Sequence, residues 1–285
     1  MLFSVLLHGG EDTGSIWEWS FDASILIGIL AWVGLYLLAN GPLRKKGGWQ
    51  RASLWQQVSF YAGTLVAFFA LVSPIDHISD EYLFSAHMLQ HMLLMMIAPP
   101  LWLIGLPNGL VDRLIPPGRL QRILRRIVHP ASAFLIYNLV FWVWHLPSLY
   151  QAALADENLH IFEHLMFIAA GMLSWWPIAG RSEKALPAVS DPVRMIYVFF
   201  MMFPTTLLAA IITFARHAFY PFYASAPRLW GLSVIDDQQL AGLIMWIPGN
   251  MIFFLAFASI FIHWFKSQDA TGEGSHDFES AEMKG

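Results

Sequence analysis

Residues 83–104 read LFSAHMLQHMLLMMIAPPLWLI, a run of 22 residues without Asp, Glu, Lys or Arg. A helix needs about 20 mainly apolar residues to cross the roughly 30 Å hydrocarbon core of a bilayer, so this run predicts a membrane span. Two histidines, His87 and His91, nevertheless lie inside it. Because an imidazole facing lipid would strand polar atoms in hydrocarbon, both side chains are expected to face other helices.

The whole chain has the composition of an integral membrane protein. Of its 285 residues, 57% are hydrophobic and only 13% are charged, whereas soluble domains carry about 25% charged residues. The formal net charge is −4, so the chain lacks the excess of positive charge that would favour a nucleic acid partner. The absence of cysteine excludes disulfides, thiolate metal sites, iron–sulfur clusters and cysteine nucleophiles.

Other segments are also long and apolar enough to cross a bilayer. The predicted spans are 20–39, 54–73, 83–104, 128–146, 159–178, 195–215 and 239–264. We therefore expect an all-α polytopic membrane protein with seven transmembrane helices in one domain, residues 1–266. Residues 267–285 are expected to form a disordered, acidic cytoplasmic tail. Pro248-Gly249-Asn250 predicts a kink or partial unwinding within the last span.

The distribution of basic residues predicts the orientation of the chain in the membrane. If the spans alternate in direction, 14 of the 16 Lys and Arg residues fall on one side, and only Arg216 and Arg228 fall on the other. Cytoplasmic loops are the ones enriched in Lys and Arg, so we expect the N-terminus outside and the C-terminus inside. Eight of the 11 histidines then fall in the outer half or in outer loops.

Two histidine pairs carry the strongest functional signal. His87 and His91 are four residues apart and share one helix face, and His160 and His164 repeat this spacing on another predicted helix. Two converging pairs can offer up to four imidazole nitrogens to one metal ion. His145, at the outer end of the fourth predicted span, is a fifth candidate ligand.

Three methionines lie close in sequence to His87 and His91, and they help to indicate which metal would bind. Met88, Met92 and Met95 place thioethers near His87 and His91, where they are candidate ligands that hand an ion along the helix. Imidazole and thioether ligands suit Cu(I) or Cu(II) better than calcium or magnesium. The same methionines are also typical of adaptable core packing.

Two other interpretations use the same histidines. A haem held between two imidazoles requires paired histidines on facing helices, as predicted here. In addition, residues 160–164, HIFEH, match the H-x-x-E-H pattern of inverted zinc peptidases, with Glu163 as the base. A peptidase site of that kind would leave the pair His87 and His91 unexplained, so we do not favour it.

These motifs resemble those of the CtaG-type cytochrome c oxidase assembly factors. The resemblance begins with HMLQHMLL at 87–94, APPL at 98–101 and GLP at 105–107. It continues with WHLPSLY at 144–150, with 160–164, with Gly171 and with WWP at 175–177. The most specific match is DQQLAGLIMWIPG at 237–249. Together these blocks cover the chain from the third predicted span to the seventh.

The resemblance implies a multi-pass protein of the bacterial plasma membrane that helps to mature the haem–copper oxidase. It implies that the protein is not an enzyme, and that it binds copper in an outward-facing site and delivers it to the binuclear (copper B) centre. The implied partners are the oxidase catalytic subunit and a copper donor protein on the periplasmic side. A metal-free chaperone of an oxidase subunit is the remaining alternative.

The resemblance also draws attention to residues around the histidines. Glu163 coincides with an acidic position of the family pattern, and Asp237 lies beside Gln238 in the most specific block. We expect Glu163, Asp237 and Gln238 to support the metal ligands without binding the ion themselves. We expect Asp237, rather than its neighbour Asp236, to accept a hydrogen bond from an imidazole and fix its tautomer. An aspartate at the start of a helix is also a good cap, which is the other interpretation of this residue.

Overall fold

The structure, a computed structural model, describes residues 15–282, with side chains described from 15 to 269. Every regular element in this part of the chain is a helix. Six helices are long and apolar enough to cross a membrane. A seventh crossing is added if α8 (Arg119–Ile127) and α9 (Pro130–Trp144), which bend by 65° relative to each other, count as one span. The described part of the chain is therefore all-helical and has the helices of a multi-pass membrane protein.

Each predicted span overlaps a helix of the structure. The six long spans are α1 (Ala23–Asn40), α3 (Leu54–Val72), the continuous helix α5 (Phe84–Met92), η2 (Leu93–Ile97) and α6 (Ala98–Gly105), α11 (Glu157–Ala179), α12 (Asp191–Phe214) and α14 (Val234–Glu282). Their starts follow ordinary capping chemistry: Asp22 caps α1, Ser53 and Gln56 form a capping box on α3, and Asp156 caps α11.

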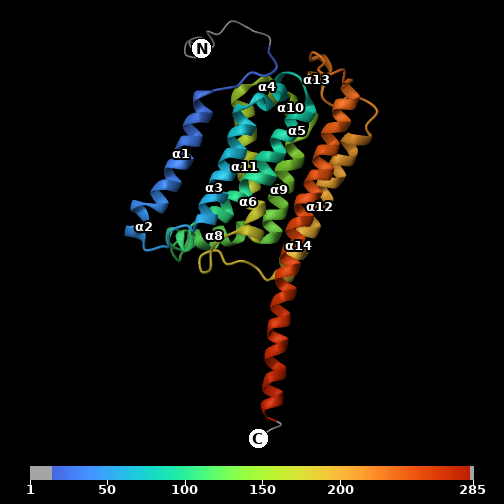
Figure 1. The fold of residues 1–285 in the computed structure, drawn as a ribbon. Coiled ribbons are helices and arrows are strands. Elements are labelled where there is room, and N and C mark those ends of the chain that lie inside the picture. Colours follow the sequence, from blue (N-terminus) through green and yellow to red (C-terminus); the bar gives the residue numbers. More distant parts are fainter. Residues whose placement is uncertain (1–14, 283–285) are drawn as a thin grey trace.

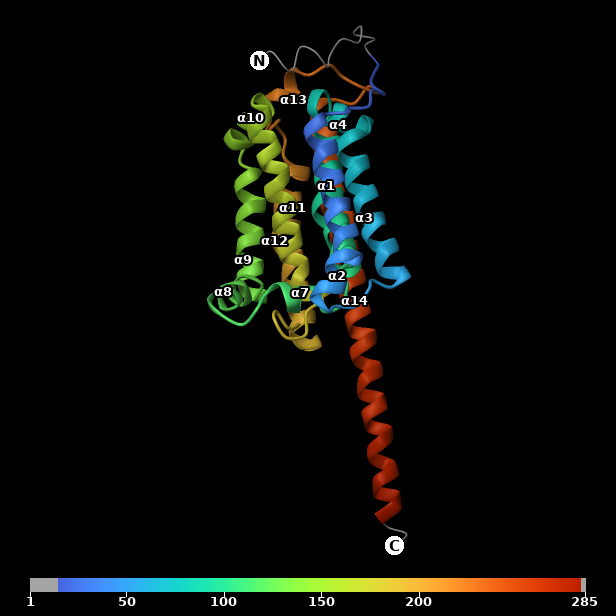
Figure 2. The same ribbon diagram turned by 90° about the vertical axis from the view of Figure 1, so that its left-hand side faces the viewer.

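The long helices stand side by side, and short helices gather at both ends of the bundle (Figure 1). At one end lie α4 (Pro74–Glu81), α10 (Pro147–Ala155) and α13 (Pro221–Ser225), and we call this the histidine end. At the other lie α2 (Pro42–Gly47), α7 (Leu110–Leu114) and α8, and we call this the basic end (Figure 2). Helix α1 lies at the edge of the bundle, and Tyr36 is its one buried residue.

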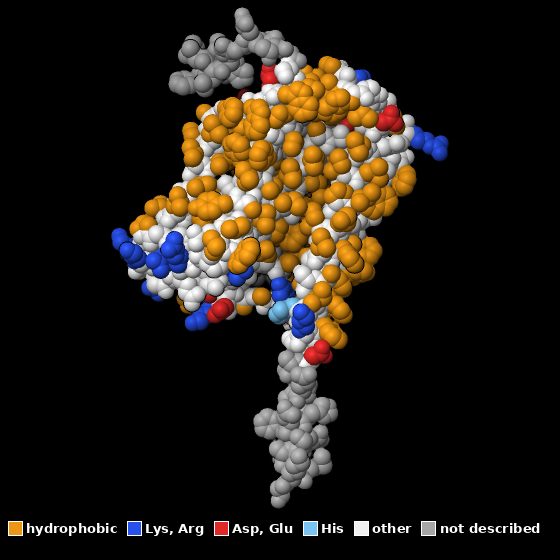
Figure 3. Space-filling view, viewed as in Figure 1, with side chains coloured by type: hydrophobic (Ala, Val, Ile, Leu, Met, Phe, Trp, Pro, Cys, Tyr) orange, Lys and Arg blue, Asp and Glu red, His pale blue; other side chains and the backbone are white. Residues whose placement is uncertain are grey.

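The surface of the bundle matches a membrane environment. Apolar side chains cover the flank between the two ends, and Lys and Arg side chains collect at the basic end (Figure 3). The basic end carries Arg44, Lys45 and Lys46 on α2 and four arginines on α8. This separation along the bundle axis agrees with the charge pattern of the sequence.

A close contact at Gly171 brings α11 against the helix that carries the first histidine pair. A Cβ atom at this position would lie 2.8 Å from the carbonyl oxygen of Met95 and 2.9 Å from Pro99, so only glycine allows this approach. Met95 belongs to η2, which is a π-helical turn. Pro99 and Pro100 have no N–H to donate to the carbonyls of Met95 and Met96, which accounts for the wider turn.

Two sequence expectations fall on the last helix; of the first, a kink or partial unwinding at Pro248, the structure contradicts only the unwinding. Helix α14 runs through Pro248 without unwinding, as membrane helices can when neighbouring groups satisfy the freed backbone. It then stays helical to Glu282, through the segment expected to be a disordered tail, with residues 283–285 outside the described part. Helical hydrogen bonds are local, and the chain contains no proline after Pro248 to interrupt them.

Candidate metal centre

The two histidine pairs meet inside the bundle near the histidine end. His87 and His91 lie on α5, and His160 and His164 lie in the first turns of α11. The ring centroids of His87 and His160 are 5.4 Å apart, and those of His91 and His164 are 5.3 Å apart. The structure thus brings together all four primary candidates, which we call the histidine cluster.

Potential ligand atoms in the cluster form two overlapping sets of three. One set is His87, His160 and His164, and the other is His87, His91 and Glu163; within each set the ligand atoms lie within 4.8 Å of one another. Ligands about 2 Å from an ion lie roughly 3–4 Å apart, so a small movement of the side chains closes either set. Glu163, expected only to support the ligands, is therefore a candidate ligand itself.

Several buried polar atoms of the cluster have no hydrogen-bond partner among the described residues. These atoms are Nδ1 of His91, Nε2 of His160, Nε2 of His164 and both carboxylate oxygens of Glu163. Folded proteins pair nearly all buried polar atoms, because an unpaired polar group in a low-dielectric interior costs free energy. A cation held among these atoms would satisfy them, so the donor set fits a metal ion.

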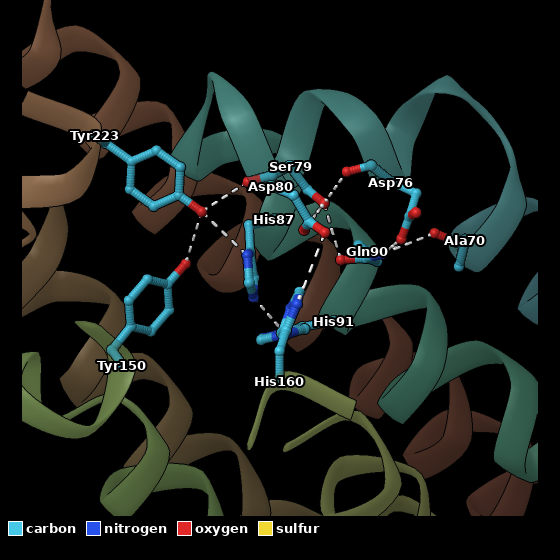
Figure 4. Close-up of polar contacts among 10 residues, drawn as sticks. All are labelled: Ala70, Asp76, Ser79, Asp80, His87, Gln90, His91, Tyr150, His160 and Tyr223. Carbon is cyan, nitrogen blue, oxygen red and sulfur yellow. Dashed lines mark hydrogen bonds and ion pairs between the residues drawn. The ribbon is translucent and has the colours of Figure 1, made fainter. Parts of the chain in front are cut away.

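His87 is held from both sides by hydrogen bonds (Figure 4). Its Nε2 lies 2.7 Å from Nε2 of His91, and its Nδ1 lies 3.1 Å from the hydroxyl of Tyr223. The Tyr223 hydroxyl donates its proton to the carbonyl of Ser79 at 2.8 Å, and it also lies 3.2 Å from the hydroxyl of Tyr150. Nδ1 of His87 must then be the donor to Tyr223, which leaves a lone pair on Nε2 of the neutral ring for a metal ion.

An acidic residue lies at the solvent side of the cluster. Oδ2 of Asp80 is 3.7 Å from Nδ1 of His160, and the two side chains are 34% and 14% exposed. His164 is 9% exposed, and His91 and Glu163 are 3% and 1% exposed. The cluster therefore runs from a partly exposed carboxylate into the fully buried interior.

Hydrogen bonds from Gln90 connect α5 to α3 and α4 at the histidine end. Its Nε2 donates to the carbonyl of Ala70 at 2.9 Å and to Asp76 at 2.8 Å, and its Oε1 accepts from the hydroxyl of Ser79 at 3.1 Å (Figure 4). Burial raises the pKa of Asp76 to about 7; the nearby Asp80 acts in the same direction, and the hydrogen bond from Gln90 opposes them. These bonds hold α4 over the cluster.

His145 lies near the cluster but belongs to neither set. Its Nδ1 is 2.6 Å from the carbonyl of Phe141, and its Nε2 is buried without a partner. The ring centroid of Phe167 lies 4.4 Å from that of His91 and 6.1 Å from that of His145. His145 therefore lies beside the cluster and outside both sets of three, and its role as a ligand stays a prediction.

The candidate methionine ligands are part of the main hydrophobic core. Met88, Met92 and Met95 are all buried there. A Cβ atom on Gly249 would lie 3.3 Å from the terminal methyl of Met92, so this side chain packs against α14. The contacts agree with the packing interpretation, and a role for thioether sulfur stays a prediction.

Asp237 contacts the helix of the first pair rather than an imidazole. Its Oδ2 accepts from the backbone N–H of Phe84 at 2.9 Å, and its Oδ1 accepts from that of Ser85 at 3.0 Å. The first N–H groups of a helix have no partner within the helix, and α5 has no side-chain cap from its own preceding residue. Asp237 therefore positions the histidines through the backbone, which corrects the expected bond to an imidazole.

The neighbours of Asp237 have separate structural roles. Asp236 accepts a hydrogen bond from the hydroxyl of Ser233 at 2.7 Å, at the start of its own helix. Gln238 accepts from the backbone N–H of Phe219 at 2.8 Å and donates to the carbonyl of His217 at 3.1 Å, so it holds the segment that leads into α13.

Sequence reasoning did not assign site roles to three residues that surround the cluster. Asp80, Tyr150 and Tyr223 come from the short helices α4, α10 and α13, which lie outside the predicted spans. Tyr150 ends the WHLPSLY block, and Asp80 is one of three acidic residues between the second and third predicted spans. Tyr223 had no distinguishing sequence signal.

Comparison with known proteins identifies the relatives of this chain. Residues 34–267 match the family described as cytochrome c oxidase caa3 assembly factor (Caa3_CtaG). The chain is 26% identical over 266 residues to uncharacterized proteins of Mycobacterium bovis and Mycobacterium tuberculosis, and 23% identical over 264 residues to one of Mycobacterium leprae. Each alignment covers 86% of this chain but only 39% of the relative. No solved structure matches the chain.

Proposed function

Because the chain belongs to the cytochrome c oxidase caa3 assembly factor family, we propose that it carries copper for the oxidase. In this proposal the histidine cluster accepts a copper ion from a donor protein and helps to deliver it to the binuclear (copper B) centre of the catalytic subunit. The observation that supports the proposal is the group of buried imidazole and carboxylate atoms without partners. Imidazole nitrogen is a suitable ligand for copper in either oxidation state.

The orientation of the chain follows from its charges. The basic end corresponds to the cytoplasmic side, because Lys and Arg are retained there. The histidine end then faces the outer, periplasmic side of the bacterial plasma membrane, and the partly exposed Asp80 lies where copper would arrive. An acidic residue at this opening attracts cations toward it.

The proposed activity is binding and transfer, without catalytic turnover. The chain contributes neutral imidazoles, and the hydroxyl of Tyr223 keeps the proton of His87 on Nδ1, away from the ligand nitrogen. Because only neutral imidazole binds metal, we expect the affinity for copper to fall as the pH is lowered.

The first test is elemental analysis with an absorption spectrum of the detergent-purified protein. We expect close to one copper per chain and no haem band in the wild type, and loss of copper in the His87→Ala/His91→Ala double variant. His263→Ala is the matched control, because this exposed histidine pairs with Asp191 away from the cluster.

Other results of this experiment would favour the alternatives. A Soret band that disappears in the double variant would replace copper with haem as the bound group. Absence of both copper and haem, together with normal oxidase assembly when all four cluster histidines are changed, would favour a metal-free chaperone.

A further inference from the structure

We infer that the histidine cluster contains two copper positions in series, which share His87, and that the ion they carry is Cu(I). This inference rests on the proposed copper function and deepens it. The solvent-side position consists of His87, His160 and His164, and the buried position consists of His87, His91 and Glu163.

The order of the two positions follows from exposure. Asp80, 34% exposed, is next to His160 of the solvent-side position. His91 and Glu163 complete the buried position and are 3% and 1% exposed. An ion arriving from solvent therefore meets Asp80 and His160 before it can reach Glu163.

The shared residue makes the two positions alternatives rather than a two-ion centre. His87 can offer only one nitrogen to a metal ion, Nε2, because its Nδ1 donates to the hydroxyl of Tyr223, and a bound ion would replace the hydrogen bond between Nε2 and His91. Nε2 of His91 lies only 2.7 Å from this atom. The ion can therefore stay bound to His87 while His160 and His164 are exchanged for His91 and Glu163. This step changes ligands only, and the oxidation state of copper stays the same.

The charges of the cluster favour a monovalent ion. Glu163 is the one carboxylate among the ligands of the two positions, Asp80 lies at the partly exposed side of the cluster, and the histidine ligands are neutral when bound to metal. Among the described residues, neither carboxylate forms an ion pair with Lys or Arg. In the buried position, Cu(I) with Glu163 and two neutral imidazoles has no net charge, whereas a divalent ion would leave one positive charge in a low-dielectric interior.

The test uses Cu(I) added anaerobically to the full chain in detergent. X-ray absorption spectroscopy counts the imidazole ligands, and competition with a chromophoric Cu(I) chelator measures the affinity. In the wild type we expect one Cu(I) with two imidazoles and one oxygen. In Glu163→Gln we expect one Cu(I) with three imidazoles and an affinity at least about tenfold lower, because the ion moves to the solvent-side position.

Two further variants check the assignment. His160→Ala should keep the two-imidazole spectrum of the wild type, because it leaves the buried position complete. Glu157→Gln changes an exposed acid on the same helix, α11, and should match the wild type in spectrum and affinity. Helical circular dichroism and the melting temperature of each variant show that the fold is retained.

The outcomes separate this inference from the proposed function. If Glu163→Gln binds no Cu(I), as expected for His87→Ala, or keeps the wild-type spectrum, there is a single site and the serial arrangement is overturned while copper binding stands. Tighter binding of Zn²⁺ or Cu(II) than of Cu(I) by the wild type overturns the assignment of the ion. A wild type that binds no copper in any form contradicts the proposed function itself.

Discussion

Two carboxylates at opposite ends of the bundle differ sharply in their hydrogen bonding. Asp112, at the basic end, accepts from the hydroxyl of Ser182 at 2.5 Å and from the N–H groups of residues 183–185 at 2.8–3.1 Å. Glu163, near the histidine end, is buried more completely but has no hydrogen-bond partner within the part of the chain that the structure describes. Hydrogen bonds from the chain itself satisfy Asp112, whereas Glu163 is left available to a bound ligand.

This difference separates a structural acid from a functional one. Asp112 holds the loop that follows α11, so its hydrogen bonds contribute to the stability of the fold. Glu163 contributes no such bond, and its burial costs free energy until a ligand compensates for it. Groups that cost stability in the free protein are typical of binding sites.

The largest expected effect comes from removing His87, the ligand that the two sets share. His87→Ala removes the one residue that belongs to both ligand sets, so we expect the affinity for copper to fall by more than about 100-fold. The melting temperature without copper should change far less than the affinity. The measurement is chelator competition, and an affinity within threefold of the wild type would remove the cluster as the copper site.

The next effect concerns the cap that holds the first histidine pair in place. Asp237→Ala leaves the buried N–H groups of Phe84 and Ser85 without an acceptor, and we expect a loss of about 3 kcal/mol of stability. Asp237→Asn keeps one acceptor oxygen and should lose less. Thermal unfolding in detergent measures both variants, and equal melting temperatures for Asp237→Ala and the wild type would show that the cap is unimportant.

Replacement of each carboxylate by leucine should change the stability of the copper-free protein in opposite directions. Glu163→Leu removes a buried group without partners and should stabilise the copper-free protein by about 1–2 kcal/mol, while it weakens copper binding. Asp112→Leu removes the acceptor of four hydrogen bonds and should destabilise the protein. Melting temperatures of both variants without metal provide the comparison; a loss of stability in both would mean that Glu163 has a structural role.

The smallest effect is a pH dependence at the basic end. Partial burial tends to raise the pKa of Asp112, but the backbone N–H of Ala185, the hydroxyl of Ser182 and two further N–H groups outweigh it and lower the pKa to about 2. The unfolded value is 3.8, so the stabilisation is complete above about pH 4 and is lost as the pH falls toward 2. Asp112→Asn should flatten the melting-temperature profile in this window, and an unchanged profile would assign the acid sensitivity to other groups.

The sequence by itself determined the membrane spans, the helical fold class and the two paired-histidine faces. Hydropathy over about 20 residues is a local property, and the spacing of His87 and His91, or of His160 and His164, places each pair on one face of its own helix. The separation of basic residues along the chain is equally local. None of these features depends on how the helices pack.

Only the tertiary structure decided which of these residues meet. Asp237 caps a helix that begins 153 residues earlier in the chain, and Tyr223 and Asp80 reach the cluster from short helices between the spans. The prolines after η2 account for the wider helical turn at Met95. Contacts between distant segments depend on packing, which local hydropathy and helix period do not specify, so the membership of Glu163 and the position of His145 outside both sets could be learned only from the folded chain.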